Sequence, residues 1–457
     1  MNNSIAQNDF DTKQLSDSIQ TFFSRFRIAS LLKKANAKKE KGIAPVRILQ
    51  YLFMLIFRNK SMYMDQSLHH EEMDFGKDTI YRFMKNIHIN WNRFTALLAA
   101  KISTEVMIPA TSEDRVNAFV IDDSVFSRNR SKKVELLTKI YDHADHKYLF
   151  GFRMLTLGWT DGNSFLPVAG TLLSSENEKT RVNEAASLDR RTNAYKRRKL
   201  AVSKGTDVML ELLLEAKMAM IPADYVLFDS WFSSPKSLHA VKSLGYDVIA
   251  MIKKSDRMKF GYLGQQCSLK EIYNRNRKRR GRSKYLLSVD IDVEKDGKTI
   301  PARVVYVRNR TNRKEYLCII STNMNIDENE IIRIYSKRWQ IEVFFKVCKS
   351  YLKLVRECNS LSYDAMSAHV AIVFARYMML SVSNRESADP RTLGEIFLYF
   401  MDELADVTFL QAFHLLMEVF REKMATCFDL SENQISDMVD EFISVLTPSM
   451  QRLLKAA

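Results

Sequence analysis

The order of strand-like and helix-like segments between residues 113 and 255 constrains the fold more than any other feature of this sequence. A β-branched apolar run, NAFVIDDSVF, precedes YLFGFRMLTLGWTDGNSFLPVAGTLL, which predicts two strands joined at the turn TDGN. A helical run, a strand, a second helical run and a last strand, YDVIAMI, complete the order β-β-β-α-β-α-β. This order predicts an α/β fold, in which helices cover both faces of a mixed sheet.

Helical patterns flank this α/β region, and a strand-rich stretch interrupts it before its last helix. We expect five parts: a helical N-terminal region at 1–112, the first part of the core at 113–255, a β-rich basic insertion at 256–326, the last core helix at 327–360, and a helical C-terminal region at 361–457. Within the N-terminal region, residues 60–90 predict two short helices broken near Gly76. These helices fit either a helix-turn-helix that reads DNA or a helical bundle with a solvated basic face.

The charge balance indicates the class of partner. Lysine and arginine total 69 against 54 aspartates and glutamates, a formal charge of +15. Such an excess favours a polyanion, most often nucleic acid, with a ribosome-associated or membrane-surface protein as the alternative. The five cysteines are scattered without a CxxC motif, which predicts reduced thiols in a cytoplasmic protein. The longest apolar run, Tyr51–Phe57, is too short to span a bilayer, so we expect no membrane association.

Three carboxylates occupy positions where an ionised group needs a partner. Asp122 follows the apolar run 118–121, Asp229 follows the apolar run 225–228, and Glu342 lies on a later helix. An ionised carboxylate directly after an apolar strand costs free energy unless a cation pairs with it. Three such groups could converge on Mg²⁺ or Mn²⁺, and two such ions could activate water or a 3′-hydroxyl. The alternative is that the aspartates are ordinary turn or cap residues.

Glu342 belongs to the stretch YSKRWQIEVFFKVCKS, residues 335–350, which lacks proline and glycine and predicts one continuous helix. At about 100° per residue, four polar side chains fall within roughly 60° of one another on this helix: Tyr335, Arg338, Glu342 and Lys349. Trp339 lies beside this face. Glu342 could instead be an ordinary ion-pair partner of Arg338 or Lys346, one turn away.

The spacing Tyr335-x2-Arg338-x3-Glu342-x6-Lys349 matches the YREK signature of the DDE transposases of the insertion-sequence-4 type. VIDDSVF is similar to that family's first-aspartate strand, and VLFDSWFSSP is similar to its second. The resemblance covers about residues 115–360, and the strand-rich stretch lies where the family inserts a β-domain. It implies an RNase H-like catalytic core with the first aspartate on the first strand, the second after the fourth strand, and the glutamate on a late helix.

The resemblance implies that Asp122, Asp229 and Glu342 are catalytic residues that bind two Mg²⁺ or Mn²⁺ ions. Asp123 is the rival of Asp122. In the family pattern, however, the catalytic aspartate precedes one variable residue and then threonine or serine, as Asp122 precedes Asp123 and Ser124. Successive strand residues also point to opposite faces, so the two aspartates cannot serve the same site.

Other side chains of the same helix are implied to bind DNA. Three would contact phosphates near the cut: Tyr335, Arg338 and Lys349. This role agrees with their chemistry, because arginine forks onto phosphate and lysine offers a point charge. Lys346 is a further DNA-binding candidate, and Trp339 could either stack on a distorted or flipped base or lie in the core. Trp231, two residues after Asp229, is expected in the core.

Two basic runs are candidates for salt-dependent contacts with the DNA backbone. The denser run, Arg275–Lys284, supplies four candidates: Arg277, Lys278, Arg279 and Arg280. The run Arg190–Lys199 is similar, and the alternative for both is a solvated loop. His143 and His146 lie three residues apart in a segment that leads into a strand, so we expect a structural turn there and no metal site.

The expected function is that of a transposase of the cut-and-paste type. Such a protein binds the terminal inverted repeats of its own insertion sequence, nicks double-stranded DNA by hydrolysis, and joins the freed 3′-hydroxyl to target DNA. The family resemblance implies a hairpin intermediate, and cutting two ends together implies a homodimer in the DNA complex. Two other classes stay open: another RNase H-like metal-dependent nuclease, and a domesticated, non-catalytic DNA-binding protein.

Overall fold

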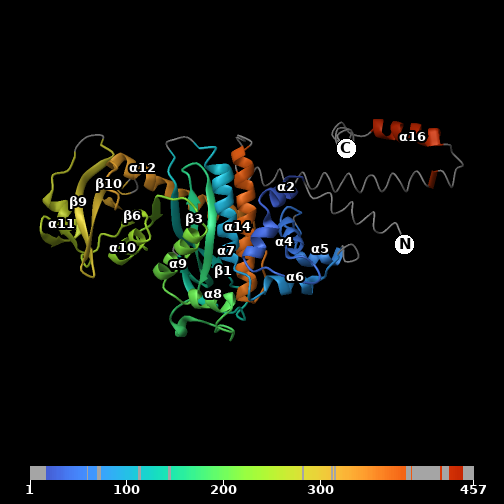
Figure 1. Cartoon of the computed structure of the whole chain (residues 1–457), viewed down its shortest axis with the longest axis horizontal. Helices are drawn as coiled ribbons and strands as arrows, with labels where there is room; N and C mark the ends of the chain where they lie inside the picture. The colour runs from blue at the N-terminus through green and yellow to red at the C-terminus, as the bar shows by residue number, and fades with distance from the viewer. Residues whose placement is uncertain are drawn as a thin grey trace.

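One mixed sheet of eleven strands organises the part of the chain that the computed structural model describes. The described residues are 17–58, 60–68, 74–111, 115–142, 146–279, 283–309, 312, 315–386, 393, 423–424 and 432–445. The sheet runs from the insertion through the core towards the helices of the N-terminal region (Figure 1). The predicted α/β class is confirmed.

Five strands of this sheet have the RNase H-like arrangement, with β1 at the centre. The antiparallel strands β3 and β4 lie on one side of β1, and the parallel strands β5 and β6 lie on the other. The bounds are β1 (Ala118–Ser127), β3 (Lys147–Thr160), β4 (Phe165–Leu173), β5 (Tyr225–Phe228) and β6 (Asp247–Ile252). The short strand β2 (Thr138–Asp142) pairs with the start of β3.

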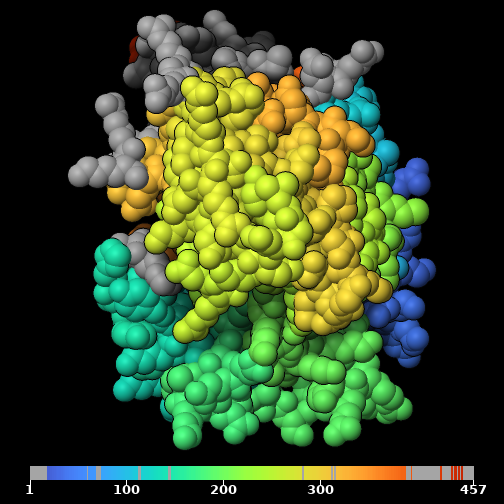
Figure 2. Space-filling view, turned by 90° about the vertical axis from the view of Figure 1, so that its left-hand side faces the viewer, coloured from blue at the N-terminus to red at the C-terminus, as the bar shows by residue number. Residues whose placement is uncertain are grey.

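The insertion extends the same sheet, because β11 pairs antiparallel with β6. Its elements are β7 (Phe260–Tyr262), β8 (Gln265–Cys267), α11 (Leu269–Arg275), β9 (Tyr285–Lys295), β10 (Lys298–Arg308) and β11 (Tyr316–Ser321). The sequence Asp296-Gly297 joins β9 to β10 with positive φ at both residues, 50° and 73°, which a tight hairpin turn requires. Figure 2 shows the insertion as the yellow and orange mass on one side of the molecule.

Helices cover both faces of the core strands. On the first face, a Cβ at Gly170 of β4 would lie 3.0 Å from Phe374 of α14, so glycine permits this close approach. On the second, Leu173 of β4 packs beside Gly205 at the start of α9. The helices that follow the core strands are α8 (Asn193–Ala201), α9 (Gly205–Met218), α10 (Pro235–Ser243), α12 (Glu328–Ser336), α13 (Gln340–Ser350) and α14 (Tyr363–Glu386).

The N-terminal region packs against the core as short helices. They are α2 (Asp17–Arg25), α3 (Ile28–Lys34), α4 (Pro45–Met54), α5 (Met62–Leu68), α6 (Lys77–Met84), α7 (Trp91–Ile102) and a π-helical turn at Ser103–Met107. The two short helices predicted between residues 60 and 90 are α5 and α6. Whether they read DNA stays a prediction.

The long helix α14 lies at the centre of the described fold. It is long and apolar enough to cross a membrane, but 94% of its most apolar window is buried inside the protein. Arg376 of α14 donates to the backbone oxygens of Leu52 and Phe53, which ties the N-terminal helices to the core. α14 forms the first part of the predicted C-terminal helical region 361–457, and α16 (Glu432–Ser444) forms a later part, while most of the residues after 386 lie outside the described ones.

Candidate active site at the edge of the sheet

The register of the parallel strands brings Asp122 and Asp229 side by side. β1 and β5 pair in parallel up to Ile121 and Phe228, and the residue that follows each of these two is an aspartate. We predicted that Asp122 follows the end of its strand, and this is wrong. β1 continues to Ser127 because its other edge stays paired with β3. Only the pairing with β5 ends before Asp122, and this opens the edge at the two aspartates.

Asp122 and Asp123 point to opposite faces of the sheet, as strand alternation requires. Asp122 accepts a hydrogen bond from Arg338 at 2.7 Å on the face that α13 covers. Asp123 is bonded by Arg153 on the opposite side, with one N–O distance of 2.8 Å. The two neighbouring carboxylates therefore belong to different clusters, and only Asp122 faces Glu342.

The segment 335–350 is not one continuous helix, contrary to our prediction. α12 ends at Ser336, a 3₁₀ turn spans Lys337–Trp339, and α13 begins at Gln340. A 3₁₀ turn winds more tightly than an α-helix, so the predicted shared face is displaced where the helices join. Trp339 sits in this turn and is 63% exposed, which rules out the core position.

Arg338 joins two of the three candidate carboxylates. Its Nη1 lies 2.7 Å from Asp122 and its Nη2 lies 2.5 Å from Glu342. The third, Asp229, is close enough for its charge to raise the pKa of Asp122. Asp122 of β1 and Glu342 of α13 therefore flank one guanidinium group, and Asp229 at the end of β5 lies near Asp122.

Burial dominates the electrostatics of this cluster. It raises the pKa of Asp122 to about 6, although Arg338 and the N–H of Asp123 oppose the shift. Burial also raises the pKa of Tyr335 to about 12. The hydroxyl of Tyr335 therefore stays protonated at neutral pH, where it can donate a hydrogen bond.

Lys349 and Lys346 occupy different surroundings on α13. Lys349 donates to Oγ of Ser124 at 2.6 Å, so it lies beside the β1 strand that carries Asp122. Burial lowers the pKa of Lys349. Lys346 is exposed one turn along α13 from Glu342, and no hydrogen bond or ion pair among the described residues joins it to the three carboxylates. The structure thus brings Tyr335, Arg338 and Lys349 to the carboxylates and leaves Lys346 outside this group.

The donor set suits a hard divalent cation, since it consists of carboxylate oxygens on three separate elements. Among the described residues, however, no three acidic, histidine or cysteine side chains lie close enough together to hold a metal ion. The guanidinium of Arg338 takes the place between Asp122 and Glu342 that a bridging cation would need. The residues fit the ion by their chemistry, and Arg338 must move for them to hold it.

Trp231 is not in the core, contrary to our prediction. It is 55% exposed, and its backbone N–H donates to Oδ1 of Asp229 at 2.8 Å. Arg153 and Lys253 each lie within cation–π distance of its indole ring, at 4.9 and 4.8 Å from the centroid. Sequence reasoning missed Arg153, although a charged residue within the otherwise apolar strand FGFRMLTL was a usable signal.

The two basic runs have different environments. Lys278 and Arg279 in the insertion lie over tyrosine rings, Arg277 is exposed, and Arg280 lies outside the described residues. The run Arg190–Lys199 forms much of α8, and its last part contradicts our expectation of a DNA-contacting surface. There Arg198 is buried and pairs with two carboxylates, so it is not free to bind phosphate.

The expected turn near residue 143 is only partly described, because His143 lies outside the described residues. His146 has a φ of 50°, a left-handed conformation typical of a tight turn. This geometry agrees with the predicted structural turn.

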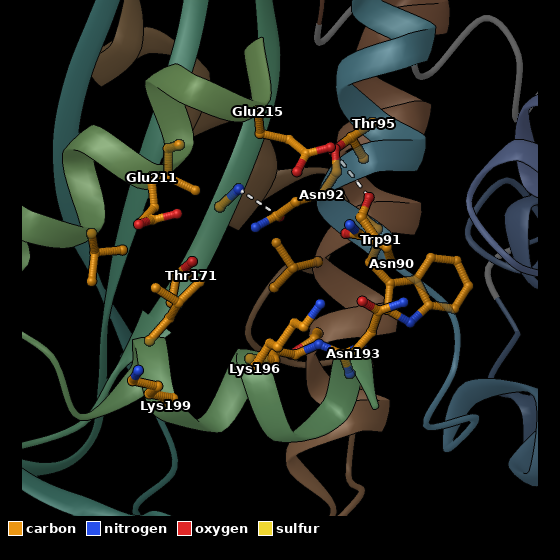
Figure 3. Close-up of a pocket in the computed structure, with 18 of the residues that line it drawn as sticks. Asn90, Trp91, Asn92, Thr95, Thr171, Asn193, Lys196, Lys199, Glu211 and Glu215 are labelled. Carbon is orange, nitrogen blue, oxygen red and sulfur yellow. Dashed lines mark hydrogen bonds between the residues drawn. The ribbon is translucent and has the colours of Figure 1, made fainter. Parts of the chain in front are cut away.

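A cavity of about 410 Å³ lies apart from the carboxylates, between α7, α8, α9, β4 and α14. Figure 3 shows lysines and glutamates from α8 and α9 around it: Lys196, Lys199, Glu211 and Glu215. None of the candidate active-site residues lines this cavity. The candidate active site is instead an open sheet edge, as expected for a long polymeric substrate.

Comparison with known proteins places the chain in a family. Residues 42–313 match the family model of the DDE superfamily endonucleases, and this match covers more than half of the chain. The protein therefore belongs to the DDE superfamily endonucleases, enzymes that cleave DNA and normally use divalent metal ions. The match includes Asp122 and Asp229 and ends before Glu342. No curated protein matches the chain.

Proposed function

We propose that this protein is a transposase of the insertion-sequence-4 type. It binds the terminal inverted repeats of an insertion sequence, cuts the DNA at the repeat ends, and joins the freed 3′-hydroxyl to target DNA. One observation carries the proposal: in a DDE superfamily chain, Asp122 and Glu342 meet through Arg338 beside Asp229 at the edge of an RNase H-like sheet. The charge of +15 supports a DNA partner.

In this proposal Asp122, Asp229 and Glu342 hold Mg²⁺ or Mn²⁺. The bound ions supply the activation of water or a 3′-hydroxyl and stabilise the leaving oxygen. The three carboxylates orient this chemistry from two strands and a helix that pack on one rigid sheet. That rigidity matters because phosphodiester cleavage depends on precise placement of the reacting groups.

Three cationic or hydroxyl groups would hold the scissile phosphate. Arg338 leaves its two carboxylates and presents its fork of N–H donors to phosphate oxygens. Lys349 contributes a point charge beside β1, and Tyr335 donates its neutral hydroxyl. Trp339, which is exposed, offers a ring on which a displaced base can stack. A homodimer would cut both ends of the element in one complex.

Cleavage of a duplex carrying the element's own terminal repeat, in Mg²⁺ or Mn²⁺, tests the proposal. Glu342→Gln keeps the helix and removes the charge, so this variant is expected to bind the duplex without nicking it. Glu330→Gln on α12, whose partner is the nearby Arg333, is the matched control and is expected to nick like wild type. Nicking by Glu342→Gln at the wild-type rate would show that Glu342 is only an ion-pair partner.

A simple RNase H-like nuclease is the second candidate, because the family match is to endonucleases. A pre-cut repeat end mixed with a target plasmid separates the two. A transposase forms a covalent joint between the 3′ end and the plasmid, whereas a nuclease yields only hydrolysed ends.

A further inference from the structure

A second group of cations lies on the same sheet edge as the carboxylates, and aromatic rings hold it in place. The turn that follows β5 fixes Asp229 and Trp231 together, because the carboxylate of Asp229 accepts the N–H of Trp231 at 2.8 Å. The exposed indole then carries Arg153 and Lys253 at 4.9 and 4.8 Å from its centroid. The second aspartate is therefore coupled directly to a cation–aromatic cluster.

The next residue along the chain continues this arrangement into the insertion. Nζ of Lys254 lies 4.7 Å from the ring centroid of Tyr316. Tyr316 stacks on Tyr273 of α11 at 4.0 Å and an interplanar angle of 21°. Lys278 lies 4.5 Å from the centroid of Tyr273, on this stacked pair.

The register of the sheet explains why these groups follow one another. β5 and β6 pair in parallel at Phe228 and Ala250, and three residues further along each chain stand Trp231 and Lys253. β6 and β11 pair antiparallel at Ile252 and Cys318, so Lys254 and Tyr316 are the corresponding pair two residues on. The cations therefore follow the sheet edge from the catalytic strands onto the insertion.

The chemistry of this edge favours phosphate. A ring beneath an ammonium or guanidinium group restricts the side chain before the ligand arrives, so less entropy is lost on binding. Neither Lys253 nor Lys278 forms an ion pair with a described carboxylate. Lys254 has Glu315 at 3.9 Å, a long and exposed pair that phosphate can displace.

We propose that this edge binds the DNA backbone that leads from the cut site onto the insertion. The track consists of three cations and the rings that hold them: Lys253, Lys254 and Lys278 on Trp231, Tyr316 and Tyr273. Arg153, which Asp123 already pairs, supports the Trp231 ring from the core side. It extends the proposed function, on which it rests, by assigning the path of the DNA beyond the carboxylates. Trp231 stands at the catalytic end of this path, beside Asp229.

The test compares two double variants in DNA binding without cleavage. Lys253→Ala/Lys254→Ala removes two cations from the track. Lys295→Ala/Lys298→Ala removes two from the tip of the β9–β10 hairpin, about 30 Å along β10 from the Tyr316 pairing. Binding of a fluorescent 30-base-pair duplex is measured in EDTA across a salt series, with wild type alongside.

The track predicts that Lys253→Ala/Lys254→Ala lowers the slope of log K against log salt by about 1.8, for two lost phosphate contacts. The hairpin variant is expected to keep the wild-type slope. Equal slopes for the two double variants would overturn the proposal. It would also be overturned if the two variants bound DNA alike and differed only in their affinity for another ligand.

A fluorescence measurement reports on the track directly. Trp91 and Trp159 are buried, so Trp339→Phe leaves Trp231 as the exposed tryptophan of the four in the chain. Duplex DNA is expected to quench this emission in Trp339→Phe, and to quench it less when Lys253→Ala/Lys254→Ala is added. Emission that DNA leaves unchanged would contradict the proposal.

The failure of the track and the failure of the proposed function give different results. If Lys253→Ala/Lys254→Ala nicks DNA normally and keeps the wild-type salt slope, the proposed track is wrong and the proposed function is unaffected. DNA binding that depends on the track, together with no cleavage by wild type, removes the proposed transposase and leaves the track as a DNA-binding surface.

Discussion

Two arginine–carboxylate clusters in this molecule contain the same chemical groups but have different roles. In the buried cluster, Arg198 of α8 lies 2.6 Å from Glu135 and 2.8 Å from Asp364 of α14. At the sheet edge, Arg338 lies 2.7 Å from Asp122. The first cluster joins two helices and a loop inside the protein, and the second faces the open edge where the substrate is proposed to bind.

The difference lies in how completely each carboxylate is satisfied. Glu135 accepts two backbone N–H groups besides Arg198, and Asp364 also bonds Arg197. Asp122 has, besides Arg338, one bond from the N–H of the following residue. A closed cluster holds its arginine permanently, whereas an open one can exchange its arginine for another cation. An arginine-rich sequence alone does not distinguish the two.

The largest effect on stability is expected from opening the buried cluster. Arg198→Met removes the cation that two buried carboxylates share, which costs about 3–5 kcal/mol in the free energy of unfolding. Urea unfolding followed by circular dichroism measures it. Arg191→Met, which removes an exposed pair with Asp189, is the control and should leave the midpoint unchanged. A stable Arg198→Met protein would contradict the structural role.

The same two clusters predict pH dependences of opposite sign. Burial alone would raise the pKa of Glu135, but the bonds from Arg198 and two backbone N–H groups outweigh it and lower the pKa. The contribution of Glu135 to stability is therefore present above its ordinary pKa of 4.5 and is lost as the pH falls. Burial raises the pKa of Asp122 to about 6, so its contribution is present below 3.8 and is lost as the pH rises through 6.

Asp122→Asn tests the pH dependence of stability that is predicted for Asp122. At pH 7.5 the wild-type protein holds a buried, ionised carboxylate that asparagine replaces without charge. A pKa raised by about two units corresponds to about 1–3 kcal/mol, so the variant should be more stable by this amount. At pH 4.5 the gain should shrink, because Asp122 is then protonated. Urea unfolding at both pH values measures the difference in the free energy of unfolding. A variant less stable than wild type at pH 7.5 would contradict the predicted contrast between the two clusters.

The smallest effects on stability are expected at the two exposed tryptophans. Trp231→Ala and Trp339→Ala should change the free energy of unfolding by less than about 0.5 kcal/mol. Their affinity for DNA should fall, since stacking on a base contributes about 1–3 kcal/mol. Trp159→Ala, which empties a fully buried site, is the contrasting control, with an expected loss of about 3–5 kcal/mol. Unfolding and DNA titrations on the same preparations measure both quantities.

The sequence was sufficient for the order of the core strands and for the pairing of the aspartates. Alternating apolar runs and turn signals predicted the mixed sheet, and the parallel register then placed Asp122 beside Asp229. Strand alternation also predicted correctly that Asp123 faces away from Asp122. These features depend on local periodicity, which a sequence carries directly.

Other features depended on tertiary contacts that periodicity does not carry. The helix break at Lys337–Trp339 has no proline or glycine to mark it. Arg198 became a core residue because Glu135 and Asp364, both distant in the chain, come to meet it. The exposure of Trp231 follows from the Asp229 turn and its neighbouring cations, which only the assembled sheet edge brings together.

Binding of Mn²⁺ tests the central claim most directly, namely that Asp122, Asp229 and Glu342 form one metal-binding centre. The free-ion electron paramagnetic resonance signal is followed while wild type and three single variants are titrated: Asp122→Asn, Asp229→Asn and Glu342→Gln. If the three carboxylates share the ions, each variant should bind at least about tenfold more weakly than wild type. A variant that retains wild-type affinity would show that its carboxylate lies outside the centre.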